Sequence, residues 1–70
     1  MAGIKSPIAG MIIAINVQVS QTITEGDMVV TIESMKMENY IFSEKSGTVK
    51  EIMFKVGDRV QEDDILAVID

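Results

Sequence analysis

The sequence contains no cysteine, no histidine and no tryptophan, and only one of its 70 residues is proline. Without cysteine, the chain has neither disulfides nor thiolate ligands for zinc. Without histidine, it cannot build a Ser-His-Asp triad, a Cys-His pair or a histidine-ligated metal site. The sequence therefore predicts no catalytic residues and no metal site, and the fold must depend on a small hydrophobic core alone.

Long apolar runs and an excess of basic charge are also missing. No apolar run approaches the roughly 20 residues that a transmembrane helix needs, which argues against membrane insertion. The formal net charge is −5, whereas a surface that binds nucleic acid is basic, so nucleic acid is not expected as a partner. Residues 1–5 lack the basic-then-apolar order of a signal peptide. We therefore expect a cytoplasmic protein.

The composition is that of one folded domain. Hydrophobic residues make up 47% of the chain and charged residues 24%, which is typical of a globular protein and not of a disordered one. A chain of 70 residues is long enough for one domain and no more. We expect a single domain over residues 1–70, and the position of Met1 at its start favours a stand-alone polypeptide.

The chain contains an internal repeat. A shift of 37 residues, which places Gly10 over Gly47, aligns residues 3–33 with residues 40–70 without a gap. We call two residues related by this shift repeat partners, and a set of partners spread along the alignment is identical or similarly apolar. They include Ile4/Ile41, Ser6/Ser43, Ile12/Val49, Ile15/Ile52, Val17/Phe54, Val19/Val56, Ile23/Val60, Glu25/Glu62, Asp27/Asp64, Met28/Ile65 and Ile32/Ile69.

Each copy of the repeat has the local signals of β-strands. Every second residue is apolar over 15–19 and again over 52–56, which predicts strands with one face turned inward. Residues 28–32 and 65–69 are short apolar runs rich in β-branched residues, as in buried strands. Neither half could bury its apolar face alone. We therefore predict an all-β fold, a flattened barrel or sandwich of two four-stranded antiparallel sheets with pseudo-two-fold symmetry.

One internal segment, residues 34–39, has no repeat partner and joins the two copies. A short joint between two strands is expected to be a hairpin at the surface. Alternation would place Met35 and Met37 on one side of it and Lys36 on the other. A lone lysine is usually a solvated charge and a methionine usually fills a gap in the core. Two methionines around a lysine in a linker indicate instead an apolar patch that a partner could grip.

The segment Glu33-Ser34-Met35-Lys36-Met37-Glu38-Asn39 resembles the attachment motif of the biotinyl domain family, in which a Met-Lys-Met triplet holds the biotinylated lysine. The resemblance covers nearly the whole chain, because residues 6–10, 25–27 and 57–58 are similar to turn segments of that family. The family has two pseudo-symmetric four-stranded sheets with the lysine on the hairpin between them. The ungapped repeat leaves no room for the extra "thumb" of some carriers, so the chain resembles the thumbless type.

The resemblance implies a biotin carboxyl carrier that is not itself an enzyme. Biotin would be the cofactor, joined to the lysine as an amide by a biotin protein ligase. A carboxyl group would then pass from a biotin carboxylase to a carboxyltransferase or a decarboxylase. Recognition roles are implied for the two methionines, whereas solvated charge explains Glu38 equally well. The implied site consists of Lys36, Met35, Met37, Glu33, Ser34 and Glu38.

The chain departs from the family pattern at two turns. Ser20 and Asp63 stand where the family often has glycine, although their repeat partners Gly57 and Gly26 keep it. Glycine suits a turn with positive φ better than either residue. These departures affect the stability of the turns and not the function.

Two alternatives to a biotin carrier remain open. A lipoyl domain resembles this chain in fold and is also modified on a hairpin lysine, so a lipoyl or dual biotin and lipoyl attachment protein is possible. The typical lipoyl triplet has an acidic residue before the lysine and a small apolar residue after it, whereas here both neighbours are methionine. The other alternative is an unmodified β-barrel module whose methionine-rich tip binds a protein.

Overall fold

The computed structural model describes residues 2–70, so Met1, on which the expectation of a stand-alone polypeptide rested, lies outside the described residues. Residues 2–70 form eight β-strands and contain no helix, and thus none long and apolar enough to cross a membrane. The strands are β1 (Ala2–Lys5), β2 (Gly10–Ile15), β3 (Thr22–Ile23), β4 (Met28–Ser34), β5 (Met37–Phe42), β6 (Gly47–Ile52), β7 (Arg59–Val60) and β8 (Ile65–Ile69).

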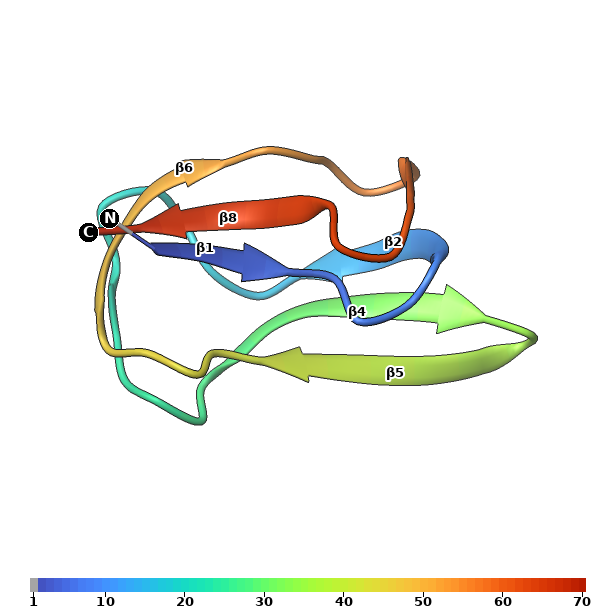
Figure 1. Ribbon diagram of the computed structural model, residues 1–70, viewed down its shortest axis with the longest axis horizontal. Coiled ribbons are helices and arrows are strands. Elements are labelled where there is room, and N and C mark those ends of the chain that lie inside the picture. The colour runs from blue at the N-terminus through green and yellow to red at the C-terminus, as the bar shows by residue number, and fades with distance from the viewer. Residues whose placement is uncertain (1) are drawn as a thin grey trace.

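The strands form two antiparallel four-stranded sheets, in the orders β1-β8-β6-β3 and β5-β4-β2-β7. Exchanging β1 with β5, β2 with β6, β3 with β7 and β4 with β8 converts one order into the other. The repeat shift carries β2 onto β6 and β3 onto β7 residue for residue. The ladders also match, because a bulge that follows Ile12 in β2 recurs after Val49 in β6. The predicted fold of two pseudo-symmetric four-stranded sheets is confirmed (Figure 1).

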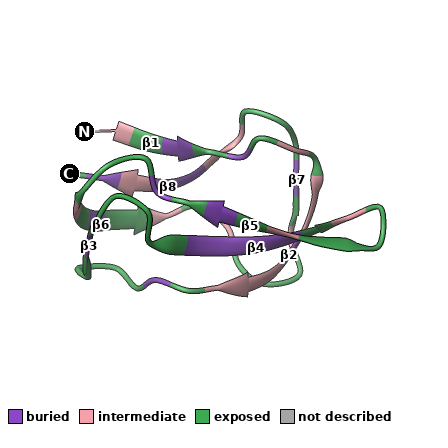
Figure 2. Cartoon of the chain, turned by 90° about the horizontal axis from the view of Figure 1, so that it is seen from below, coloured by how far each residue is buried: buried purple, intermediate pink, exposed green. Residues whose placement is uncertain are grey.

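The core lies between the sheets and is built from repeat partners. Ile12 and Ile32, which face each other across β2 and β4, are 1% and 0% exposed. Their partners Val49 and Ile69 face each other across β6 and β8 and are 0% and 3% exposed. Figure 2 shows buried segments on strands of both sheets. Each half therefore buries its apolar face against the other, as the repeat predicts.

The strands predicted over residues 15–19 and 52–56 are wrong in extent. β2 and β6 both end at the first residue of these ranges, and Val19 and Val56 are 55% and 60% exposed. Each range runs instead into a turn, in which a backbone N–H donates to the side chain three residues further on, at 3.0 and 3.1 Å. Such local side-chain bonds compete with strand pairing and end the strand despite its alternating pattern.

Four of the turns between strands contain a residue with positive φ, in the left-handed region of the backbone. Gly57 and Gly26 have φ of 97° and 95°, and their repeat partners Ser20 and Asp63 have φ of 77° and 72°. The two departures from the family pattern thus lie at positions of positive φ. A residue with a Cβ atom in this region is disfavoured by about 1–2 kcal/mol.

We predict that Ser20→Gly stabilises the domain by about 1 kcal/mol, because glycine adopts positive φ without the Cβ penalty. Urea unfolding of both proteins measures the difference. Ser20→Ala is the matched control, since alanine keeps the Cβ atom and should bring no gain. Equal stability of the serine and glycine forms would contradict the explanation.

Candidate functional site

The hairpin of β4 and β5 contains the segment that joins the two repeats. Ser34 ends β4, Met37 begins β5, and these two residues pair with each other. The turn is therefore only Met35 and Lys36, with φ of 53° and 63°. Positive φ at both central residues is the mark of a type I′ turn, whose twist matches that of the paired strands. Figure 1 shows this hairpin at the end of the molecule opposite the two chain termini.

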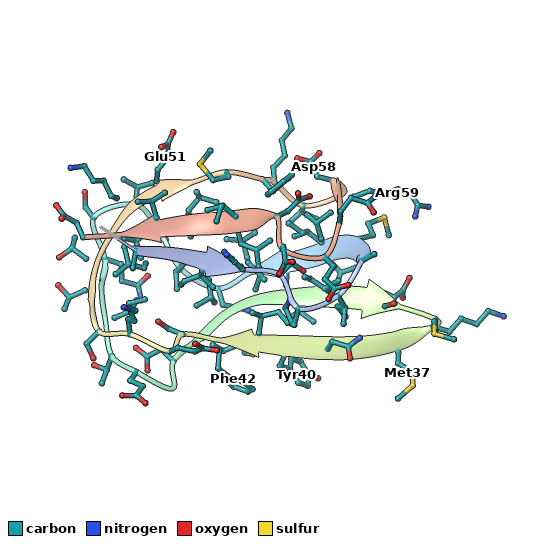
Figure 3. All side chains as sticks on the ribbon, in the orientation of Figure 1. Met37, Tyr40, Phe42, Glu51, Asp58 and Arg59 are labelled. Atoms are coloured by element: carbon teal, nitrogen blue, oxygen red, sulfur yellow. The ribbon has the colours of Figure 1, made fainter. Side chains whose placement is uncertain are left out.

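The methionines and the lysine are exposed at the tip of the hairpin. Met35 is 91% exposed and Met37 is 68% exposed, so neither fills a gap in the core. Lys36 is also exposed, and Figure 3 shows Met37 pointing away from the sheets. The alternation expected across residues 35–37 does not apply, because two of the three residues form the turn and only the third is in a strand.

The turn is made from residues poorly suited to it. Type I′ turns favour asparagine and glycine, which tolerate positive φ. Methionine and lysine in the left-handed region cost of order 1–2 kcal/mol each, and such residues concentrate at functional sites. The side chains at the tip are therefore not explained by the stability of the hairpin.

The flanks of the turn are polar. Glu33 and Glu38 are both exposed and lie directly opposite each other across the hairpin, an arrangement that like charges make unfavourable. The Tyr40 hydroxyl lies 3.3 Å from a carboxylate oxygen of Glu38 and can donate to it. The amide of Asn39 donates to the carbonyl of Met37 at 3.2 Å and to a carbonyl of β4 at 3.3 Å. The structure thus brings all six predicted residues onto one hairpin, with Asn39 as a brace that the sequence did not single out.

Lys36 presents an amine suited to covalent attachment. Among residues 2–70 the only ion pair joins Lys50 to Asp70, at 3.5 Å, so no carboxylate in this part of the chain neutralises the Lys36 ammonium. The long flexible stem of lysine at an exposed turn gives a modifying enzyme access from several directions. The residues at the tip therefore fit a group joined to this amine, and the hairpin itself offers no histidine or other neutral base to activate it.

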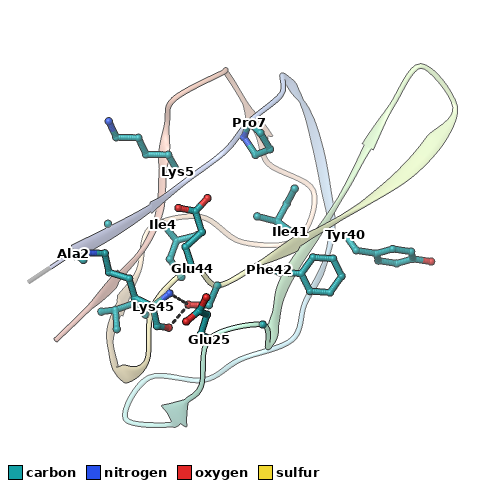
Figure 4. A pocket seen from close by; sticks show the side chains of 14 residues that line it. Ala2, Ile4, Lys5, Pro7, Glu25, Tyr40, Ile41, Phe42, Glu44 and Lys45 are labelled. Atoms are coloured by element: carbon teal, nitrogen blue, oxygen red, sulfur yellow. Dashed lines mark hydrogen bonds between the residues drawn. The ribbon is translucent and has the colours of Figure 1, made fainter.

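A larger and a smaller cavity border the sheets, and the smaller one adjoins the tip. The larger, of about 580 Å³, lies between the outer edges of β1 and β5, with Ile4 and Ile41 in its lining. Figure 4 shows these residues, with Phe42 on β5 beside them. The smaller, of about 320 Å³, includes Glu33 and Met35 in its lining.

The comparisons with known proteins define the family. The model of a family described as "Biotin-requiring enzyme" matches residues 2–69, and the chain belongs to that family. It is 36% identical over 67 residues to the mitochondrial propionyl-CoA carboxylase alpha chain of Homo sapiens, covering 96% of this chain and 9% of that one. It is 40% identical over 60 residues to the propionyl-CoA carboxylase alpha chain of Ruegeria pomeroyi, covering 86% and 9%.

Solved structures agree with this assignment. The urea carboxylase of Kluyveromyces lactis superimposes with a TM-score of 0.92 and 35% identity, over 99% of this chain and 6% of that one. A single-chain long-chain acyl-CoA carboxylase has the same fold, with a TM-score of 0.87 and 18% identity. The chain spans about a tenth of the length of the curated relatives it matches. It corresponds to the biotin carrier region of such carboxylases, a part that carries biotin and is not itself catalytic.

We predict that the double variant Met35→Asn, Lys36→Gly is more stable than the natural chain by about 1–3 kcal/mol, because both residues then suit positive φ. Urea unfolding measures this gain. Met37→Asn, which lies in β5 and outside the turn, is the control and should bring no gain. A double variant no more stable than the natural chain would show that the turn is not strained.

Proposed function

We propose that Lys36 is the residue that carries biotin, and that the hairpin of residues 34–39 is the attachment site of a single carrier domain over residues 1–70. The observation that supports this most is the turn itself. It holds a strained, exposed lysine between two exposed methionines, at the one internal segment that lacks a repeat partner. A tight turn alone would favour asparagine and glycine at these positions and does not require methionine or lysine.

The chain contributes presentation and mobility. An amide at the Lys36 amine removes its positive charge and leaves a long arm attached to a rigid hairpin. Biotin supplies a ureido ring that accepts and delivers a carboxyl group. Met35 and Met37 give the modifying and carboxylating enzymes a flexible apolar surface, since the thioether side chain adapts to different partners. Glu33, Ser34 and Glu38 complete the surface that is recognised.

The partners follow from the family. The relatives named as propionyl-CoA carboxylase and urea carboxylase support a biotin carboxylase and a carboxyltransferase or decarboxylase as the enzymes that share this carrier. A biotin protein ligase would make the amide. The proposed compartment is the cytoplasm; the relatives include proteins named as mitochondrial and proteins from bacteria.

The experiment that tests the attachment site is in vitro biotinylation. The purified protein is incubated with biotin, ATP and a biotin protein ligase, and its intact mass and modified peptide are determined. We expect one biotinyl group per chain, on Lys36, and none on Lys36→Arg. Lys45→Arg is the matched control, because Lys45 is an exposed lysine outside residues 34–39 and its loss should change nothing.

Two results would overturn the proposal. One is an unmodified protein in the presence of a ligase that modifies a control carrier, and the other is modification of a different lysine. A parallel reaction with lipoate and a lipoate ligase separates biotin from lipoyl attachment. Modification in neither reaction would favour the unmodified interaction module.

We predict that Met37→Ala lowers kcat/KM of the ligase for this protein by about tenfold, because a partner that covers the side chain gains roughly 1–2 kcal/mol from it. The unfolding free energy should stay nearly unchanged, since Met37 is 68% exposed. Val19→Ala is the control, as Val19 is 55% exposed but lies outside the hairpin. Equal ligase kinetics for Met37→Ala and the natural protein would remove Met37 from the recognised surface.

A further inference from the structure

A row of side chains crosses the sheet beside the attachment hairpin. Glu33 on β4 pairs with Met11 on β2, and Met11 pairs in turn with Arg59 on β7. Residues directly opposite in antiparallel strands project from the same face. All three line the cavity of about 320 Å³ that also includes Met35. The cavity therefore has an acidic group on one side, a cationic group on the other, and a methionine between them.

The fold itself does not require this row. In the other half of the repeat, the partners of Met11 and Arg59 are Thr48 and Thr22, which pair with each other in the same register. Two small polar residues thus occupy the equivalent positions in the sheet that has no attachment hairpin. The equivalent backbone in the other sheet therefore forms without a methionine and an arginine at these two positions. The large side chains of Met11 and Arg59 lie in the sheet whose cavity also includes Met35.

Arg59 is unpaired at the edge of this cavity. It is the only arginine in the sequence, and the single ion pair within residues 2–70 does not involve it. Figure 3 shows Arg59 directed toward the end of the molecule that bears the hairpin. Strands β4 and β7 flank β2, so Glu33 and Arg59 stand two strand spacings apart, about 10 Å. That separation leaves space over Met11 for a small ring.

A group on Lys36 can reach the cavity. Met35, which precedes Lys36, is part of the lining of the cavity, as is Glu33. In an extended strand, residues two positions apart are separated by about 7 Å, which is the most that can separate Glu33 from Met35. The lysine stem is of similar length and flexible, and the group attached to it extends the arm further. The arm can therefore fold back along β4 without any change in the sheet.

We infer that this cavity is a docking site for the ring of biotin held by Lys36, an inference that rests on the proposed function. A ureido ring has a carbonyl oxygen that accepts hydrogen bonds and N–H groups that donate them. Arg59 can donate to the oxygen and Glu33 can accept from an N–H, while Met11 contacts the apolar, sulfur-containing ring.

The test is a search for direct contacts in the biotinylated protein. The chain is labelled with ¹³C at the methionine methyl groups and biotinylated, and nuclear Overhauser effects from the Met11 methyl to biotin ring protons are measured. We expect these effects in the natural chain and their loss in Arg59→Thr. Threonine is the residue that the repeat tolerates at the equivalent position, so this variant should fold. Thr22→Ala, at the repeat partner of Arg59, is the control and should leave the effects unchanged.

The outcomes separate this inference from the proposed function. The intact mass of each sample reports attachment independently of the contacts. A chain that gains no biotinyl group overturns both the carrier proposal and the docking site. A biotinylated chain in which only residues 35–37 contact the ring, or in which Arg59→Thr keeps the Met11 contact, overturns the docking site alone.

Discussion

Two equivalent apolar faces bury each other, and this mutual burial holds the two sheets together. A domain of this size has little free energy of folding to spare, and without cysteine it has no covalent cross-link to add. Ile12 and Ile32 in one sheet, and Val49 and Ile69 in the other, are almost completely buried. Because each face is covered only by the other, the two halves must fold together, and the repeat is the simplest sequence that encodes both.

Because the two halves are equivalent, positions at which repeat partners differ are candidates for a role in function. Where the two halves face the same structural demand, they use similar residues. For example, the carboxylates of repeat partners Asp27 and Asp64 accept equivalent backbone N–H groups at 2.9 and 2.8 Å. At some positions the halves differ although the fold gives no reason for the difference. The Met35–Lys36 turn and the pair of Met11 and Arg59 are such places, and both lie at the same end of the molecule.

The sequence predicted the architecture because a strand that buries one face shows a period-2 apolar pattern, and the ungapped repeat shows that pattern twice. It failed at Val19 and Val56, whose alternation looks like a strand although local side-chain bonds end the strand before them. It placed the hairpin of residues 34–39 correctly but not its two-residue turn, because methionine and lysine are not residues that indicate positive φ. The row from Glu33 to Arg59 could not be predicted, since it depends on the pairing register of strands distant in the sequence.

The central claim is that this hairpin presents a biotin that another enzyme can load. The most direct measurement is carboxylation of the protein biotinylated on Lys36, using a biotin carboxylase with ATP and labelled bicarbonate. We expect one labelled carboxyl group per biotinylated chain and none on the unmodified chain. If the same carboxylase labels free biotin but leaves the biotinylated protein unlabelled, the hairpin does not act as a carboxyl carrier.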